Sequence, residues 1–251
     1  MTSVPRVHEF STVFNFRDLG GYPTTDGRSL RWGQVYRADG LWRLSDTDVH
    51  RFAGLGVRTV IDLRRPDELT SDGRVADSLG LEYHNVNFHA APWPEHDLGP
   101  DDMPRYLADR YADMADCGLT GTNPIGVALR LLARDAAVPL VFHCAAGKDR
   151  TGVLAALTLG VLGVDDDVIA DDYALSADAE RRFHAWRRDT TLDDAVEDGH
   201  APAWVLNPCP REAMLYFLVE LRERHGSLRA YLERAGMTEG DIEALHDRLL
   251  T

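Results

Sequence analysis

Two apolar segments in the middle of the chain are separated by a polar segment of only eight residues. The first, Pro139 to Phe142, has the length and composition of a buried strand, and the second, residues 151–162, reads as an apolar helix that ends at Gly163. A strand and a helix that are both apolar throughout must both be buried. This succession therefore favours a sheet with helices packed on its faces and a tight loop between strand and helix.

The remaining patterns extend this α/β interpretation along the chain. Strand patterns at 34–36, 57–63 and 81–88 alternate with helix patterns in the first two thirds of the chain, and beyond Gly163 the strong patterns are helical. The expected helices cover 45–53, 104–114, 125–133, 166–175, 178–188, 211–225, 228–235 and 238–250. We predict a single α/β domain over residues 1–251, with a central, mainly parallel sheet flanked by helices and a helical C-terminal third packed on it.

Charge and apolar content exclude several classes of protein. The chain has 41 acidic and 27 basic residues, a net charge of −14, so we expect neither a nucleic-acid partner nor stable association with an anionic membrane. No apolar run approaches the length of a membrane span, and residues 1–10 lack the apolar stretch of a secretory signal. Three cysteines cannot form a disulfide framework in a chain of this length. A cytoplasmic location is the expectation.

The polar segment His143-Cys144-Ala145-Ala146-Gly147-Lys148-Asp149-Arg150, followed by Thr151-Gly152, has the features of a phosphate-binding loop. Small residues let the backbone wrap an oxyanion closely, and the N-terminus of the following helix presents its positive end to the same point. The guanidinium of Arg150 can hold two phosphate oxygens at once. We therefore expect residues 145–148 and Thr151 to bind a phosphate group beside Arg150.

The same surroundings act on Cys144. A helix N-terminus, loop amides and a nearby guanidinium all favour the thiolate, which is the nucleophilic form of cysteine. Thr151 is placed to donate a hydrogen bond to that sulfur, and His143 to support the cysteine from behind. We expect Cys117 and Cys209 to be structural, with a resolving thiol as the minority alternative.

Two other motifs do not fit this segment. A nucleotide-binding Walker loop requires glycine at position 142, which is phenylalanine here, and serine or threonine at position 149, which is aspartate. A zinc site requires clustered cysteine and histidine, whereas the three cysteines lie far apart in the sequence.

The spacing of Cys144, five residues and Arg150, followed by Thr151, resembles the cysteine-dependent protein tyrosine phosphatase superfamily. More narrowly, the chain resembles a bacterial tyrosine-protein phosphatase family that has a mycobacterial member. The supporting stretches occur in order over residues 14–250 and are N-F-R-D-L-G-G at 15–21, T-V-I-D-L-R at 59–64, D-Y at 172–173, G-S-L at 226–228 and Y-L at 231–232.

The resemblance implies a metal-independent, cofactor-free phosphomonoester hydrolase that forms a phosphocysteine. Cys144 would attack phosphorus, Arg150 would stabilise the transition state, and water would then hydrolyse the intermediate. Asp149 is the first candidate for the general acid. Glu95 and Asp97, which follow Trp93-Pro94, are the alternatives.

The substrate stays open between phosphoproteins and phosphoinositides, with inorganic phosphate as the product. Lys148 is the only lysine of the chain, and its place in the loop is similar to that of a lysine in lipid phosphatases. The resemblance also implies a helical lid over residues 176–210. The four arginines of this stretch, Arg181, Arg182, Arg187 and Arg188, are candidates to meet a phosphate, although a solvated helix face is the more common role of such a cluster.

Three other functions fit the sequence less well than a phosphatase. A rhodanese-type loop is usually one residue shorter between cysteine and arginine, and an arsenate reductase needs resolving cysteines close by. Intact Cys144, Arg150 and Thr151 argue against a catalytically silent phosphate-binding module.

Overall fold

The structure is a computed structural model that describes residues 5–88, 98–99, 101–119, 122–190 and 209–251. In these ranges, five strands form one sheet in the order β1-β2-β5-β3-β4. The strands are β1 (Arg17–Asp18), β2 (Val35–Ala38), β3 (Thr59–Asp62), β4 (Glu82–Asn85) and β5 (Leu140–His143). All neighbouring pairs are parallel except β1 with β2. The predicted α/β class with a mainly parallel sheet is confirmed.

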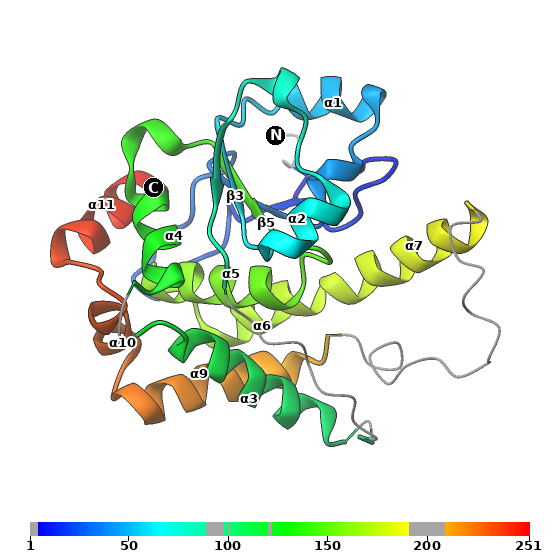
Figure 1. Cartoon of the computed structure of the whole chain (residues 1–251). Coiled ribbons are helices and arrows are strands. Elements are labelled where there is room, and N and C mark those ends of the chain that lie inside the picture. The colour runs from blue at the N-terminus through cyan, green and yellow to red at the C-terminus, as the bar shows by residue number, and fades with distance from the viewer. Residues whose placement is uncertain (1–4, 89–97, 100, 120–121, 191–208) are drawn as a thin grey trace.

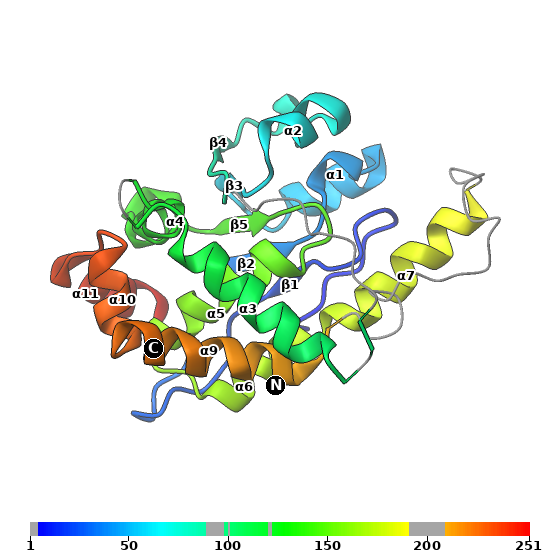
Figure 2. The same cartoon turned by 60° about the horizontal axis from the view of Figure 1, so that its bottom comes forward.

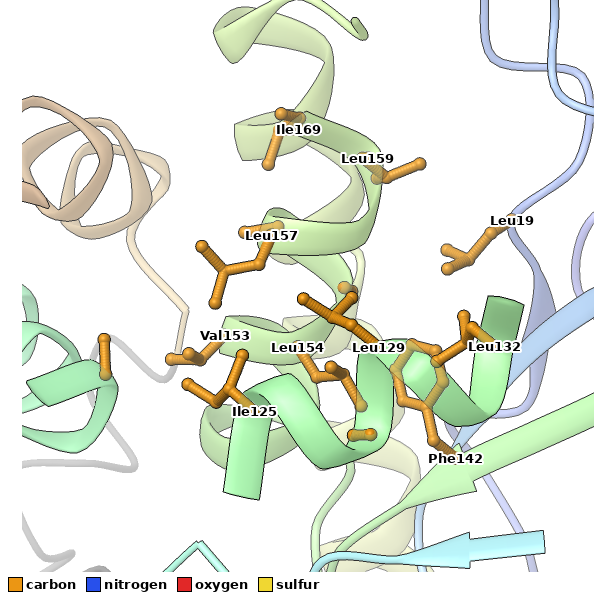
Figure 3. Packing of buried hydrophobic residues seen from close by; sticks show 14 of the residues in the cluster. Leu19, Ile125, Leu129, Leu132, Phe142, Val153, Leu154, Leu157, Leu159 and Ile169 are labelled. Carbon is orange, nitrogen blue, oxygen red and sulfur yellow. The ribbon is translucent and has the colours of Figure 1, made fainter. Parts of the chain in front are cut away.

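Strand β5 occupies the centre of the sheet because its side chains are apolar on both faces. Phe142 faces a large apolar cluster formed with α4 and α5, whereas Val141 faces a second cluster that contains Val60 and Phe52. Successive side chains of a strand point to opposite faces, so one short strand anchors both layers. Figure 3 shows Phe142 beside Leu132 in the larger cluster.

Helices cover both faces of the sheet (Figures 1 and 2). They are α1 (Asp46–Ala53), α2 (Pro66–Asp72), α3 (Met103–Asp116), α4 (Pro124–Ala133), α5 (Asp149–Val161), α6 (Asp166–Ala174), α7 (Ser176–Asp189), α9 (Arg211–His225), α10 (Leu228–Arg234) and α11 (Glu239–Leu249). Helices α3 and α9 lie side by side, and α7 projects from the body of the molecule in both views. None of the described helices is long and apolar enough to cross a membrane.

The carboxyl ends of β2, β5 and β3, three of the four parallel strands, meet at one edge of the sheet. Ala38 and Asp62 both pair with His143, the last residue of β5. Ligands of parallel α/β sheets bind outside this edge, where the loops leave the strands. The polar segment after β5 leaves the sheet here and enters α5 at Asp149, two residues earlier than the sequence pattern predicts.

Candidate active site

The phosphate loop, residues 144–150, has its carbonyl groups tied to the surrounding chain. The carbonyl oxygen of Ala145 accepts a hydrogen bond from the Gly40 amide at 3.0 Å. The Asn15 side-chain amide donates to the carbonyls of Ala146 and Gly147 at 3.1 and 3.0 Å. In the described part of the chain, no amide of residues 145–148 donates to a backbone acceptor. A short loop whose amides are left free in this way, ahead of a helix N-terminus, can bind an anion.

Gly147 is required at its position by two constraints. Its φ of +67° lies in the left-handed region that favours glycine. A Cβ atom there would lie 2.5 Å from the carbonyl oxygen of Ala38, at the end of β2. The loop therefore packs directly on the neighbouring strand end.

A buried ionic network supports the loop from behind. Asp172 of α6 accepts from the Arg17 Nε at 2.9 Å and from Arg37 at 2.6 Å. Arg37 also donates to the Gly147 carbonyl at 2.9 Å, and Arg17 donates to the Asn15 side chain. Burial alone would raise the pKa of Asp172, but the two guanidiniums hold it well below its ordinary value. The network connects β1, β2 and α6 to the loop.

Cys144 is 2% exposed and follows directly on β5. The Nδ1 of His143 lies 3.1 Å from the Cys144 carbonyl oxygen, and its Nε2 lies 3.5 Å from Asp62. Burial lowers the pKa of His143, although Asp62 opposes this, so the imidazole is neutral and donates from Nδ1. The Thr151 hydroxyl is buried with no hydrogen-bond partner among the described residues. Its bond to the cysteine sulfur stays a prediction.

Arg150 is held by a carboxylate that the sequence analysis missed. Its two terminal nitrogens donate to the two oxygens of Glu68 at 2.6 and 2.8 Å. Glu68 also accepts from the Arg65 amide at 2.9 Å at the start of α2. Burial lowers the pKa of Arg150, but the hydrogen bonds to Glu68 and the nearby Cys144 have the opposite and larger effect. The pKa is therefore raised overall, and the guanidinium stays charged. This pair fixes the plane of the guanidinium beside the loop.

Asp149 is oriented by two tyrosines. The Tyr111 hydroxyl of α3 donates to the Asp149 carboxylate at 2.6 Å, and its oxygen lies 2.6 Å from the Tyr173 hydroxyl. Burial, together with the nearby charge of Asp149, raises the pKa of both tyrosines well above 10, so both keep their protons. Glu95 and Asp97 lie outside the described residues.

Lys148 is nearly buried, at 5% exposure, and points toward α7. Its Nζ lies 3.8 Å from Oε2 of Glu180. Burial lowers the pKa of Lys148, but the carboxylate of Asp149, with smaller contributions from Cys209 and Glu180, raises it overall. The ammonium group is therefore charged at neutral pH.

A cavity of about 300 Å³ separates the loop from α7. Its lining residues are Asn15, Asp39, Trp42, Arg43, Ala145, Ala146, Ala179, Glu180, Phe183, His184 and Arg187. The aromatic rings of Trp42 and Phe183 contribute to its wall, and the Arg43 guanidinium lies 4.8 Å from the Phe183 ring centroid. The cavity reaches the loop at Ala145 and Ala146. It can accommodate an aromatic group attached to a phosphate in the loop.

Comparison with known proteins decides the family of this chain. A model of the tyrosine phosphatase family matches residues 8–251. The chain belongs to the tyrosine phosphatase family. A Cupriavidus necator protein that is named a tyrosine-protein phosphatase is 33% identical to this chain over 251 residues. The match covers 96% of this chain and 87% of that protein. The triple specificity protein phosphatase PtpB of Mycobacterium tuberculosis is 28% identical over 290 residues, covering 97% and 99%. A tyrosine-protein phosphatase of Nostoc commune is 29% identical over 223 residues, covering 85% and 73%.

This tyrosine phosphatase brings most of the residues expected from the sequence to one loop. Glu95 and Asp97 lie outside the described residues, and in α7 Arg181 and Arg182 pair with Asp178 at 3.0 and 2.9 Å. Of the four arginines in this stretch, Arg187 lines the cavity. Residues 191–208 of the expected lid lie outside the described part of the chain, so the lid stays a prediction.

The residues that sequence reasoning missed come from distant elements. Glu68 lies in α2 and Glu180 in α7, and neither stands out in the sequence. The sequence gives a weak indication for Arg37, because a charged residue within a short, buried strand needs a partner of opposite charge. Among the described residues, no group of three or more histidine, cysteine, aspartate and glutamate side chains could hold a metal ion.

Proposed function

We propose that this tyrosine phosphatase hydrolyses phosphotyrosine in proteins through a phosphocysteine on Cys144. The observation that carries the proposal is the phosphate loop itself. Its carbonyls accept hydrogen bonds from Asn15, Arg37 and Gly40, and among the described residues the amides of residues 145–148 donate to no backbone acceptor, which leaves them available to a phosphate beside Cys144 and Arg150. Such an arrangement binds a phosphate dianion and stabilises the added charge of a phosphoryl-transfer transition state.

In the first step, the Cys144 thiolate attacks phosphorus. The S–P bond forms while the bond between phosphorus and the phenolic oxygen breaks, and the electron pair of that bond goes to the oxygen. In the form of the enzyme that starts the cycle Asp149 carries a proton, which it donates to this oxygen, so tyrosine leaves neutral; the second step returns that proton to Asp149. Arg150, oriented by Glu68, and the loop amides hold the equatorial phosphate oxygens.

In the second step, water hydrolyses the phosphocysteine. The Asp149 carboxylate takes a proton from the attacking water, the O–P bond forms, and the S–P bond breaks with its electrons returning to the sulfur. The products are inorganic phosphate and the free thiolate. The residues of the loop and Arg150 supply the charge stabilisation, and the proposed cycle uses no metal or cofactor.

The cavity beside the loop favours an aryl phosphate over a phosphoinositide. Trp42 and Phe183 contribute aromatic side chains to its wall, and such side chains pack favourably against a phenol ring. Arg43, a cation in its wall, already has an acidic partner, because it pairs with Asp39. A phosphoinositide would need further cations for its additional phosphates. Three cysteines without disulfide partners support a reducing compartment, the cytoplasm.

Hydrolysis of p-nitrophenyl phosphate with a chelator present tests this function. We expect the full chain to be active and insensitive to the chelator, and Cys144→Ser to lose about 10⁴-fold or more of kcat, because it lacks the nucleophile. Cys117→Ser is the matched control and should keep its activity. Substantial turnover by Cys144→Ser, or loss of wild-type activity in the chelator, would contradict the proposal.

A further inference from the structure

Glu180 places a buried carboxylate beside a site that binds an anion. Its side chain is 14% exposed, and Oε2 is buried without a hydrogen-bond partner. This same oxygen lies 3.8 Å from the Lys148 ammonium, and Glu180 lines the cavity together with Ala145 and Ala146. A fixed negative charge here would repel a phosphate dianion and would occupy a cation that the dianion needs.

The groups that face Glu180 come from every element around it. They are Lys148 and Asp149 from the loop, Tyr173 from α6, Cys209 ahead of α9, the Asp39–Arg43 pair across the cavity, and His184 and Arg187 on α7 itself. Burial raises the pKa of Glu180 to about 7, with Lys148 opposing and Asp149 adding to the rise.

Two of these neighbours keep their protons throughout the neutral range. Burial raises the pKa of Cys209 to about 12, and burial raises that of Tyr173 well above 10. Lys148 stays charged over the same range because its own pKa is raised. Of these four groups, Glu180 is therefore the one that changes charge near pH 7.

We propose that Glu180 and the incoming phosphate compete for Lys148, so that phosphate binding is coupled to proton uptake by Glu180. In the empty site, ionised Glu180 pairs with Lys148. When a dianion enters the loop, the ammonium turns to the phosphate oxygens, and Glu180 loses its counter-charge beside a new negative group. The carboxylate then takes one proton from solvent and can donate a hydrogen bond in place of accepting one. The location of the phosphate rests on the proposed function.

Linkage fixes the sign of the pH dependence. Below its pKa, Glu180 is neutral and Lys148 is available, so a dianion binds tightly. Above that pKa, Glu180 is ionised, and affinity falls by up to about tenfold per pH unit until the pKa of the bound state is reached. Glu180→Gln imitates the protonated form and should bind a dianion with nearly constant affinity from pH 6 to pH 8.

Calorimetric titration with sulfate tests the coupling, because sulfate stays a dianion over this whole range. The full chain with Cys144→Ser is used as the background, so that ionisation of the thiol does not contribute. Titrations at pH 7.5 in two buffers with different ionisation enthalpies give the number of protons taken up. In the background we expect an uptake of between about half a proton and about one proton for each sulfate bound. When Glu180→Gln is added, we expect an uptake close to zero. Asp178→Asn, an exposed carboxylate on the same helix, should match the background.

Equal proton uptake with and without Glu180→Gln would overturn the coupling while leaving the phosphate site intact. Weaker sulfate binding by Glu180→Gln than by the background at pH 8 would overturn it as well. If sulfate does not bind the background at all, the phosphate site of the proposed function fails together with the coupling.

Discussion

Gly147 lets the phosphate loop pack on the end of β2, and this contact is testable at a single residue. Gly147→Ala would place a methyl group 2.5 Å from the Ala38 carbonyl in a backbone conformation with φ of +67°. We expect the loop to shift and kcat/KM for an aryl phosphate to fall about 100-fold or more, because a misplacement of about 1 Å is enough for such a loss. Gly73→Ala is the matched control, since Gly73 has φ of +79° but open space around it. Equal activity losses in the two variants would contradict this role.

Glu68 gives a second prediction at the residue scale. Glu68→Gln leaves one acceptor where Arg150 now has two charged ones. A hydrogen bond to a charged group contributes about 1.5–3 kcal/mol, so we expect kcat/KM to fall about 10- to 100-fold. The exposed neighbour Asp67 pairs with Arg65, and Asp67→Asn should change little. Unchanged kcat/KM in Glu68→Gln would show that catalysis does not depend on the orientation of Arg150 by Glu68.

At the scale of elements, Asp172 joins α6 to β1 and β2. Asp172→Asn would leave Arg17 and Arg37 buried without a charge partner, which costs about 3–5 kcal/mol of unfolding free energy. The pKa of Asp172 is held below its ordinary value, so its contribution is complete above the unfolded pKa near 4 and is lost as pH falls through the folded pKa. Urea unfolding should therefore show a variant that is less stable at pH 7 and whose stability falls less steeply below pH 4.

Asp171→Asn is the control for this element, because Asp171 is exposed and pairs with the partly exposed Arg211. Its unfolding free energy should stay close to that of the wild type. The same stability loss in both variants would mean that the buried network does not join the elements.

Helix α7 is expected to contribute to substrate selection through Phe183. Phe183→Ala removes an aromatic wall of the cavity, and we expect kcat/KM for a phosphotyrosine peptide to fall about tenfold, with little effect on a phosphoserine peptide. Tyr216 of α9 is an exposed aromatic residue that does not line the cavity, so Tyr216→Ala is the control. Equal losses for the two peptides would place the substrate elsewhere.

Most helices and strands could be predicted from the sequence, whereas the side-chain contacts between distant elements could not. The cap of α1, where Ser45 accepts from the Asp48 amide, and the apolar helix α5 follow from local spacing. The residues proposed to bind phosphate could be grouped from the sequence because they are consecutive. Glu68 and Glu180 were not, because they reach the loop only through tertiary packing from 82 and 32 positions away in sequence from Arg150 and Lys148 respectively. Strand β1, two residues long, has no detectable period.

For the whole molecule, the net charge of −14 acts on substrates before they reach the loop. An acidic phosphopeptide is repelled at low ionic strength. At roughly 0.15 M salt, the repulsion between charges more than about 8 Å apart is largely screened. We expect kcat/KM for an acidic phosphopeptide to rise between about 0.01 M and about 0.15 M salt, and that for a basic phosphopeptide to fall. Identical salt dependence for the two peptides would show that the overall charge has no role in association.

Mass spectrometry of the acid-quenched enzyme tests the central claim most directly. The full chain is mixed with p-nitrophenyl phosphate, quenched within the first turnovers and digested. The account predicts a mass increase of one HPO₃ group on the peptide that contains Cys144, located on the cysteine itself and absent in Cys144→Ser. Phosphate on any other residue during turnover would contradict it.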